Sequence, residues 1–177
     1  MKYVALLRAI NVGGNNLIKM SELKEAFEKH GLKEVKTYIN SGNVIFESDE
    51  KNNETLTKEL ENMLSKTFNY TARVIVKSQK QIQQVVKEVP TEWNTQDDLR
   101  CYIGFLADSF TAEEAAKEVK IREGVDSLKA GPGVLYMTTL LSERTKSAFG
   151  RLVGTELYHN MSIRNFNTTK KNLSLME

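Results

Sequence analysis

The sequence has one cysteine, two histidines and two prolines in 177 residues, and it has no long hydrophobic run. The lone Cys101 cannot form an intrachain disulfide, and its apolar neighbours favour a buried small hydrophobe over a reactive thiol. Neither His30 nor His159 stands at a metal-ligand spacing, so we expect no metal. No stretch approaches the ~18 apolar residues of a membrane span, and the N-terminal apolar run is too short for a signal peptide. We therefore expect a cytoplasmic protein without a membrane partner.

An excess of charge is also missing. Lys and Arg number 25 and Asp and Glu number 23, so the net charge of +2 does not by itself indicate nucleic acid or an anionic membrane. Residues 142–177 are mildly basic, which makes nucleic-acid contact through C-terminal helices an alternative. The hydrophobic content of 40% and the charged content of 27% are those of a folded globular protein. The length fits one domain or two small halves.

The first half of the sequence alternates between strand and helix patterns. Residues 3–10 are apolar on both alternating faces, which predicts a central strand covered on both sides. Ser21 is a candidate N-cap for the following helix, and His30-Gly31 is a candidate stop. The pattern continues with a hairpin (35–39 and 44–46), a helix (56–68) and a strand (72–76). The order βαββαβ is that of a ferredoxin-like fold with spatial strand order 4-1-3-2.

The second half repeats part of this pattern without a detectable sequence repeat. A Ser78-x-x-Gln81 capping box opens a helix that Pro90 closes, and 91–98 is the best linker, where Trp93 is a packing anchor or an exposed contact. A strand (100–106), a helix and a hairpin across 130–133 follow, and then two C-terminal helices. The predicted fold is therefore α+β. A ferredoxin-like half (1–90) packs against a similar but incomplete βαββ half with C-terminal helices (99–177).

Two polar segments meet at one end of the first predicted sheet. Strands one and two run parallel in this topology, so the loop 11–16 and the turn 40–43 share an end, which the segment 69–70 also reaches. Glycine backbone, a helix N-terminus and the Arg8 guanidinium together suit an anionic group. The alternative is that the glycines only permit turns, the asparagines satisfy local backbone and Arg8 pairs with a structural carboxylate.

Three separated segments are similar to one known family. They are Leu6-Leu-Arg-Ala-Ile-Asn-Val-Gly-Gly14, Thr37-Tyr-Ile-Asn-Ser-Gly-Asn-Val44 and Ile163-Arg-Asn-Phe-Asn-Thr168. In these the chain resembles the bacterial family catalogued as domain of unknown function 1697, with Asn40 where Gln is common and Phe166 where Trp is common. The resemblance implies a ferredoxin-like α+β fold but no reaction. It also implies a cluster of Arg8, Asn11, Gly13, Gly14, Ser41, Gly42, Asn43, Arg164, Asn165 and Asn167.

The segment that starts the last helix admits two interpretations. Asn165 can simply cap that helix, or Arg164 and Asn167 can fold back onto the first loop and join Arg8 around one pocket. No phosphate loop or dinucleotide fingerprint is present, and Ser41 lacks a nucleophile elbow. We therefore expect a binding protein for a small anionic or phosphorylated ligand at Gly13-Gly14 and 40–43. A ligand-free interaction module is a further alternative, and the sequence assigns no enzyme activity, cofactor or oligomeric state.

Overall fold

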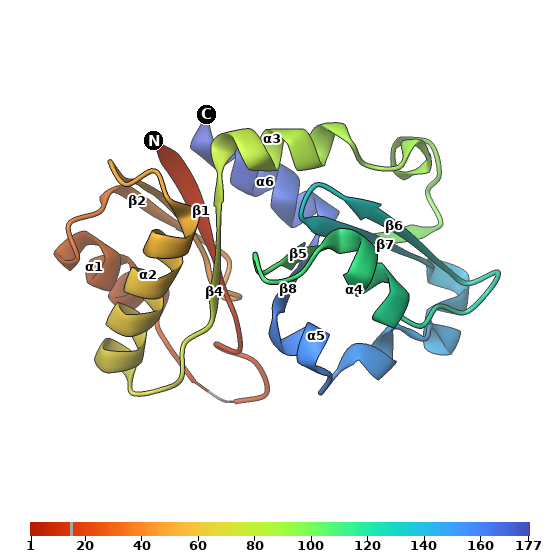
Figure 1. Cartoon of the computed structure of the whole chain (residues 1–177), viewed down its shortest axis with the longest axis horizontal. Helices are drawn as coiled ribbons and strands as arrows, with labels where there is room; N and C mark the ends of the chain where they lie inside the picture. Colours follow the sequence, from red (N-terminus) through yellow and green to blue (C-terminus); the bar gives the residue numbers. More distant parts are fainter. Residues whose placement is uncertain (15) are drawn as a thin grey trace. The chain divides into compact units, whose positions relative to one another are not determined.

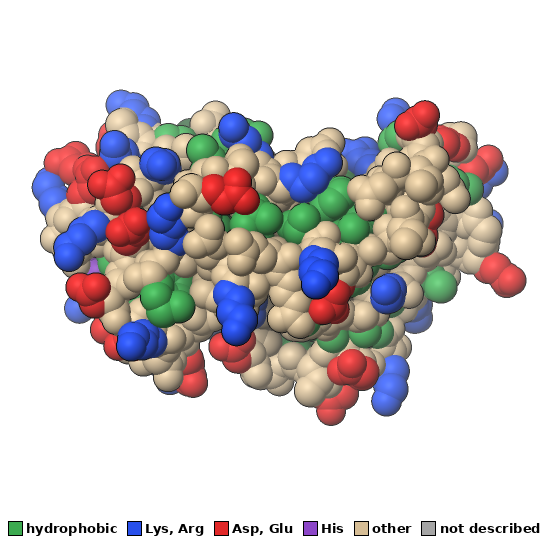
Figure 2. Space-filling view, turned by 90° about the horizontal axis from the view of Figure 1, so that it is seen from above, with side chains coloured by type: hydrophobic (Ala, Val, Ile, Leu, Met, Phe, Trp, Pro, Cys, Tyr) green, Lys and Arg blue, Asp and Glu red, His purple; other side chains and the backbone are tan. Residues whose placement is uncertain are grey.

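The computed structural model describes residues 1–14 and 16–177, so Asn15 of the predicted loop lies outside the described residues. It has a mixed α+β fold with two four-stranded antiparallel sheets, which confirms the predicted class at this level (Figure 1). The chain divides into unit 1, residues 1–82 and 171–177, and unit 2, residues 83–170. The predicted halves, 1–90 and 99–177, stay a prediction. Acidic and basic side chains are interspersed on the face shown in Figure 2.

Unit 1 carries the first sheet, whose strand order is β2-β3-β1-β4 with β1 in the interior, as the sequence indicates. Helices α1 and α2 cover one face, where Tyr3 and Leu7 of β1 pack with Phe27 and Leu60 (Figure 1). The other face of β1, with Val4 and Leu6, is also buried. The elements are β1 (Lys2–Leu7), α1 (Met20–Lys29), β2 (Lys33–Tyr38), β3 (Asn43–Glu47), α2 (Asn53–Phe68), β4 (Val74–Ser78) and the start of α3 (Gln79–Lys87).

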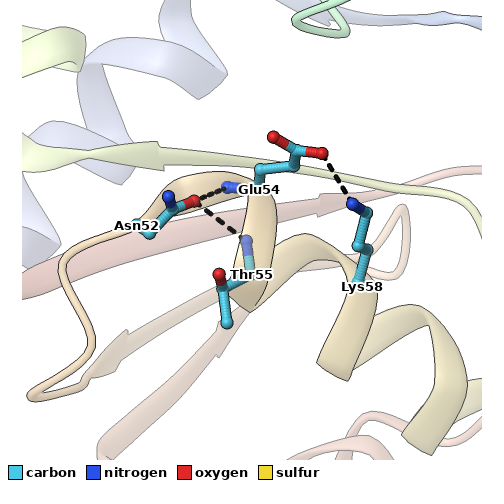
Figure 3. A network of polar contacts seen from close by, with 4 residues as sticks. All are labelled: Asn52, Glu54, Thr55 and Lys58. Atoms are coloured by element: carbon cyan, nitrogen blue, oxygen red, sulfur yellow. Dashed lines mark hydrogen bonds and ion pairs between the residues drawn. The ribbon is translucent and has the colours of Figure 1, made fainter.

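The helix ends of unit 1 follow local hydrogen-bonding rules, with one exception. Helix α2 is capped by Asn52, whose Oδ1 accepts from the N–H groups of Glu54 (2.8 Å) and Thr55 (3.0 Å), and Glu54 pairs with Lys58 (Figure 3). The predicted capping box at α3 is confirmed, since Gln81 accepts from the Ser78 N–H at 2.8 Å. The prediction of Ser21 as the α1 cap is wrong: the N-cap position is Lys19, two residues earlier, and its side chain makes no capping hydrogen bond.

The predicted hairpin between β2 and β3 is confirmed, and its turn contains two residues with left-handed backbone. Ile39 has a φ of +49°, which is strained for a β-branched residue, and its side chain is 46% exposed. Gly42 has a φ of +77°, and a Cβ there would lie 2.8 Å from both Leu7 Cβ and Ile10 Cδ1. The Gly42 carbonyl accepts from the Leu7 N–H at 2.8 Å, which ties the turn to the end of β1.

Substitutions at these two turn positions are expected to act in opposite directions. Ile39→Gly should raise the free energy of unfolding by up to about 1 kcal/mol, because it removes a left-handed penalty and little buried surface. Gly42→Ala should lower it by about 1–3 kcal/mol, because it adds strain and a close contact. Urea unfolding followed by far-UV circular dichroism measures both changes. If both variants raised the free energy of unfolding, or both lowered it, the strain argument for these two positions would be contradicted.

Unit 2 carries the second sheet, whose strand order is β6-β7-β5-β8. This is the strand order of the first sheet, with β5 in the interior position of β1. The hairpin across 130–133 is confirmed, but the prediction of an incomplete half is wrong because β8 supplies a fourth strand beside β5. The elements are the end of α3, η1 (Thr91–Asn94), β5 (Leu99–Leu106), α4 (Ala112–Glu118), β6 (Asp126–Gly131), β7 (Val134–Leu140), η2 (Leu141–Lys146), η3 (Phe149–Leu152), α5 (Glu156–His159), β8 (Met161–Asn165) and the start of α6 (Phe166–Met176).

The connection from β7 to β8 is not the regular helix that the apolar spacing of residues 141–153 predicts. It consists of the short 3-10 helices η2 and η3 and the four-residue α5, and η2 contains no buried residue. Gly154, with a φ of +86°, lies between η3 and α5. Thr155 caps α5, because its Oγ1 accepts from the Tyr158 N–H at 3.1 Å. Residues that form turns therefore prevent a continuous helix here, although the apolar residues have helical spacing.

A buried carboxylate holds this irregular connection against the sheet. Asp126 is 6% exposed and accepts from the N–H groups of Ala148 (2.7 Å) and Arg122 (3.0 Å) and from Thr139 Oγ1 (2.9 Å). Burial acts to raise the pKa of Asp126, but these hydrogen bonds, with one from Ser147, outweigh it and hold the pKa below its ordinary value. The ionised form is therefore the one that the fold stabilises.

Asp126→Asn is expected to lower the free energy of unfolding at pH 7 by about 1–3 kcal/mol, because an amide cannot accept all of these bonds. A lowered pKa stabilises the fold above the unfolded value of about 3.9, and this contribution is lost as the pH falls through the folded value. The deficit of the variant should therefore shrink below pH 4. Urea titrations at pH 7 and pH 3 test this, with the exposed Asp97→Asn as control. A deficit independent of pH would contradict it.

Candidate functional site

The first loop of unit 1 lies where the sequence predicts, beside the β2–β3 turn. The Asn11 side chain joins the two segments: its Nδ2 donates to the carbonyls of Ile18 and Asn40, both at 2.9 Å, and its Oδ1 accepts from the Ile18 N–H at 2.8 Å. Strand β1 ends at Leu7 rather than at residue 10, because Ala9 and Asn11 both have left-handed backbone. Asn11 thus closes the loop on itself and fixes it to the turn.

The remaining predicted residues of unit 1 differ in their access to solvent. Gly13, Gly14 and Asn40 are exposed, and Arg8 and Ser41 are half-buried. Asn43 is fully buried: its Nδ2 donates to the Tyr38 carbonyl (3.1 Å) and to Ser41 Oγ (3.2 Å).

Asn43 also binds a residue that sequence reasoning missed. Its Oδ1 accepts from Nδ2 of Asn172, 129 residues away in α6 and 2% exposed. This amide pair ties the end of the chain to the turn, and no local pattern around Asn172 signals it. The amides of Asn11 and Asn43 are therefore used within the fold.

The third predicted segment belongs to unit 2, where it lies at the junction of β8 and α6. Arg164 is 9% exposed, and its Nη1 donates to the Ile163 carbonyl at 3.0 Å. Asn165 caps α6, since its Oδ1 accepts from the Asn167 N–H at 2.8 Å, which confirms the simpler interpretation of this residue. The joining of Arg164 and Asn167 to the first loop stays a prediction.

Asn165 and Asn167 line a cavity of about 330 Å³ that we call the β8–α6 cavity. Its other polar residues are Arg100 and Cys101 of β5 and Lys170 of α6. Its apolar wall is formed by Trp93, Leu99, Leu141 and Phe166. Segments from three separate parts of unit 2 therefore meet here, and sequence reasoning identified only the two asparagines as site residues.

The apolar wall of the cavity is rigidly held. Trp93 is 8% exposed, its Nε1 donates to Thr138 Oγ1 at 2.7 Å, and its ring packs edge-on against Phe166 (5.1 Å) and Tyr136 (5.7 Å). The Tyr136 hydroxyl donates to the Val85 carbonyl at 2.8 Å. These contacts confirm Trp93 as a packing anchor, and Trp93 also forms part of the cavity wall.

The cavity is electropositive. Its charge comes from Lys170, whose Nζ lies 4.7 Å from the centre of the Phe166 ring. The guanidinium of Arg100 lies 5.3 Å from the centre of the Tyr102 ring, which is not part of this lining. Among the described residues, the cavity lining includes no carboxylate, although Glu92, outside the lining, acts electrostatically on Cys101. The N-terminal end of α6 adds a partial positive charge to that of Lys170. The arrangement suits an anion.

Cys101 is half-buried, where the sequence predicts a buried side chain, and its thiol is largely protonated at neutral pH. Burial, with a smaller contribution from Glu92, raises the pKa of its thiol to about 11, although Lys170 acts in the opposite direction. Within the described residues, no three His, Cys, Asp or Glu side chains gather in a way that could hold a metal ion. None of the described helices combines the length and apolarity that crossing a membrane requires.

Comparison with known proteins places the chain in a family. It is similar to the solved structure of the conserved bacterial protein SP0830 from Streptococcus pneumoniae, with a TM-score of 0.86 and 24% sequence identity, over 99% of this chain and 98% of that one. At this identity the likeness shows the fold alone. No curated protein matches the sequence. Residues 1–136 match a family model, and because this is more than half of the sequence, the chain belongs to the family described as "Protein of unknown function (DUF1697)".

Proposed function

We propose that the protein binds a small anionic or phosphorylated ligand, and that the β8–α6 cavity of unit 2 holds it. One observation carries the proposal: Lys170 of α6 and the side-chain amides of Asn165 and Asn167 line a single cavity that contains no carboxylate among its described residues. A charge-assisted hydrogen bond from a lysine to an anion is among the stronger polar contacts that proteins make. Asn167 adds a side-chain amide donor at the exposed end of the cavity.

The cavity is a better supported location than the Gly13-Gly14 loop. In that loop the side chain of Asn11 is already bonded within the fold, and the two glycines are exposed. In the cavity, by contrast, a lysine, two side-chain amides and an aromatic wall come together. Anion binding at Gly13-Gly14 and 40–43, which the sequence predicts, stays a prediction.

The proposal includes the scaffold. We infer that each unit is a ferredoxin-like fold, which is supported by the same strand order in both sheets and by the helix that connects the first two strands of each. In this arrangement β1 and β5 are equivalent interior strands. The proposed cavity then lies where β5 begins and β8 ends, at one end of the second sheet.

The sole tryptophan of the chain provides a direct test, because Trp93 lines the cavity. Titration with inorganic phosphate should change Trp93 fluorescence saturably, and chloride at matched ionic strength should not. Lys170→Met should weaken phosphate binding about tenfold or more, the loss expected for one charge-assisted hydrogen bond. Lys171→Met is the matched control, because Lys171 is the adjacent exposed lysine and does not line the cavity.

Three outcomes of this titration separate the alternatives. Absence of a saturable change with phosphate, pyrophosphate and nucleoside monophosphates would count against the proposal. Equal losses in the two lysine variants would contradict a defined site. Binding of an oligonucleotide that weakens steeply with salt and depends on both lysines would favour the nucleic-acid alternative instead.

The raised pKa of Cys101 gives a second expected outcome. The rate constant for alkylation of the thiol by iodoacetamide should rise about tenfold per pH unit from pH 7 to pH 10 without levelling off, because only the thiolate reacts. An unperturbed cysteine, with a pKa of about 8.5, would level off near pH 9. Saturating phosphate should slow the reaction further, and a plateau near pH 9 would contradict the raised pKa of this thiol.

A further inference from the structure

A second cavity of unit 2 arises from a difference between the two sheets. In unit 1 the connection from β3 to β4 is the 16-residue helix α2, whose buried Leu56, Leu60 and Leu64 cover the sheet. In unit 2 the equivalent connection from β7 to β8 consists of the short segments η2, η3 and α5. η2 contributes no buried residue, and Tyr102 and Ile163 on this face of the second sheet are only half-buried. A groove of about 360 Å³ lies there, and we call it the crossover groove.

The crossover groove has an apolar floor and a cationic rim. Met137, Tyr102 and Ile163 of the sheet and Phe149 of η3 form the floor, and the last three are only half-buried. Half-buried apolar side chains around a concavity favour a ligand with an apolar body, since its burial is worth about 25 cal/mol per Å². The rim carries the exposed guanidinium groups of Arg100 and Arg144.

The charge of this rim is not cancelled from within the lining. The groove is lined by no carboxylate among the described residues, and Glu143, next to Arg144, pairs with Lys146. Asp126 is the carboxylate behind the groove, but it is buried and bonded to Ala148, Arg122 and Thr139. A guanidinium pair above an apolar floor matches a carboxylate at the end of an apolar chain, because arginine binds carboxylate through two parallel hydrogen bonds.

We propose that the crossover groove binds a small monocarboxylic acid with an apolar chain. The carboxylate lies at Arg100 and Arg144, and the chain lies on Tyr102, Phe149 and Ile163. This site is separate from the β8–α6 cavity, although Arg100 lines both. The affinity of the crossover groove thus depends on the length of the ligand's apolar chain, whereas the β8–α6 cavity is proposed to bind a compact anion.

Calorimetric titration with octanoate, butyrate and octan-1-ol tests the proposal. We expect octanoate to bind to one site at least tenfold more tightly than butyrate, because the longer chain covers more of the floor. We expect octan-1-ol to bind at least tenfold more weakly than octanoate, because it lacks the charge. Equal affinities for octanoate and butyrate would overturn the apolar part, and equal affinities for octanoate and octan-1-ol would overturn the guanidinium part.

Variants then locate the site. Arg144→Met should weaken octanoate binding about tenfold or more. The control Arg151→Met, which replaces an exposed arginine of η3 outside the lining, should not. Unchanged circular dichroism and urea midpoints exclude loss of folding as the cause. Arg144→Met should leave phosphate binding unaltered, and Lys170→Met should leave octanoate binding unaltered, so this proposal and the proposed function fail separately. Equal effects of the Arg144 and Arg151 variants would overturn the assignment.

Discussion

Each unit of this fold depends on burying one interior strand on both faces. Every residue from Tyr3 to Leu7 of β1 is at most 1% exposed, and Ile103, Phe105 and Leu106 of β5 are equally buried. A strand in this position can carry almost no polar side chain, because an unpaired polar group in the core costs several kcal/mol. Polar chemistry is therefore confined to the strand ends and to the connections. Both proposed sites obey this constraint, since they lie at the first residues of β5 and under the β7–β8 connection.

The same constraint explains why the first half of the fold could be predicted. Uninterrupted apolar residues in β1 indicate an interior strand, and the order of strands and helices then leaves few right-handed arrangements. The observed order β2-β3-β1-β4 is the predicted one. The missing fourth strand of unit 2 has a physical reason. β8 has five residues, Met161–Asn165, and includes a buried arginine, so neither its length nor its polarity is that of an interior strand.

The proposed site was only partly visible in the sequence. Asn165 and Asn167 attract attention as a local cluster, but Arg100 and Lys170 stand 70 residues apart and have no shared pattern. Only strand pairing, Tyr102 opposite Asn165, brings the start of β5 to the end of β8. Conversely, Asn11, Gly42 and Asn43 form a conspicuous motif whose contacts in the structure are largely internal. Turn chemistry and ligand chemistry use the same residue types, and sequence spacing cannot separate them.

The two units share a strand order and differ most in the second connection, and this difference bears on where binding takes place. The regular helix α2 covers its sheet with the buried Leu56, Leu60 and Leu64, one at every turn. The connection in unit 2 is interrupted by turn-forming residues and needs the Asp126 carboxylate to hold it. A buried charge is a costly way to stabilise a loop, since it must keep all of its hydrogen bonds. What this connection gains over a helix is a concave surface beside two arginines, and the proposed carboxylate site depends on that surface.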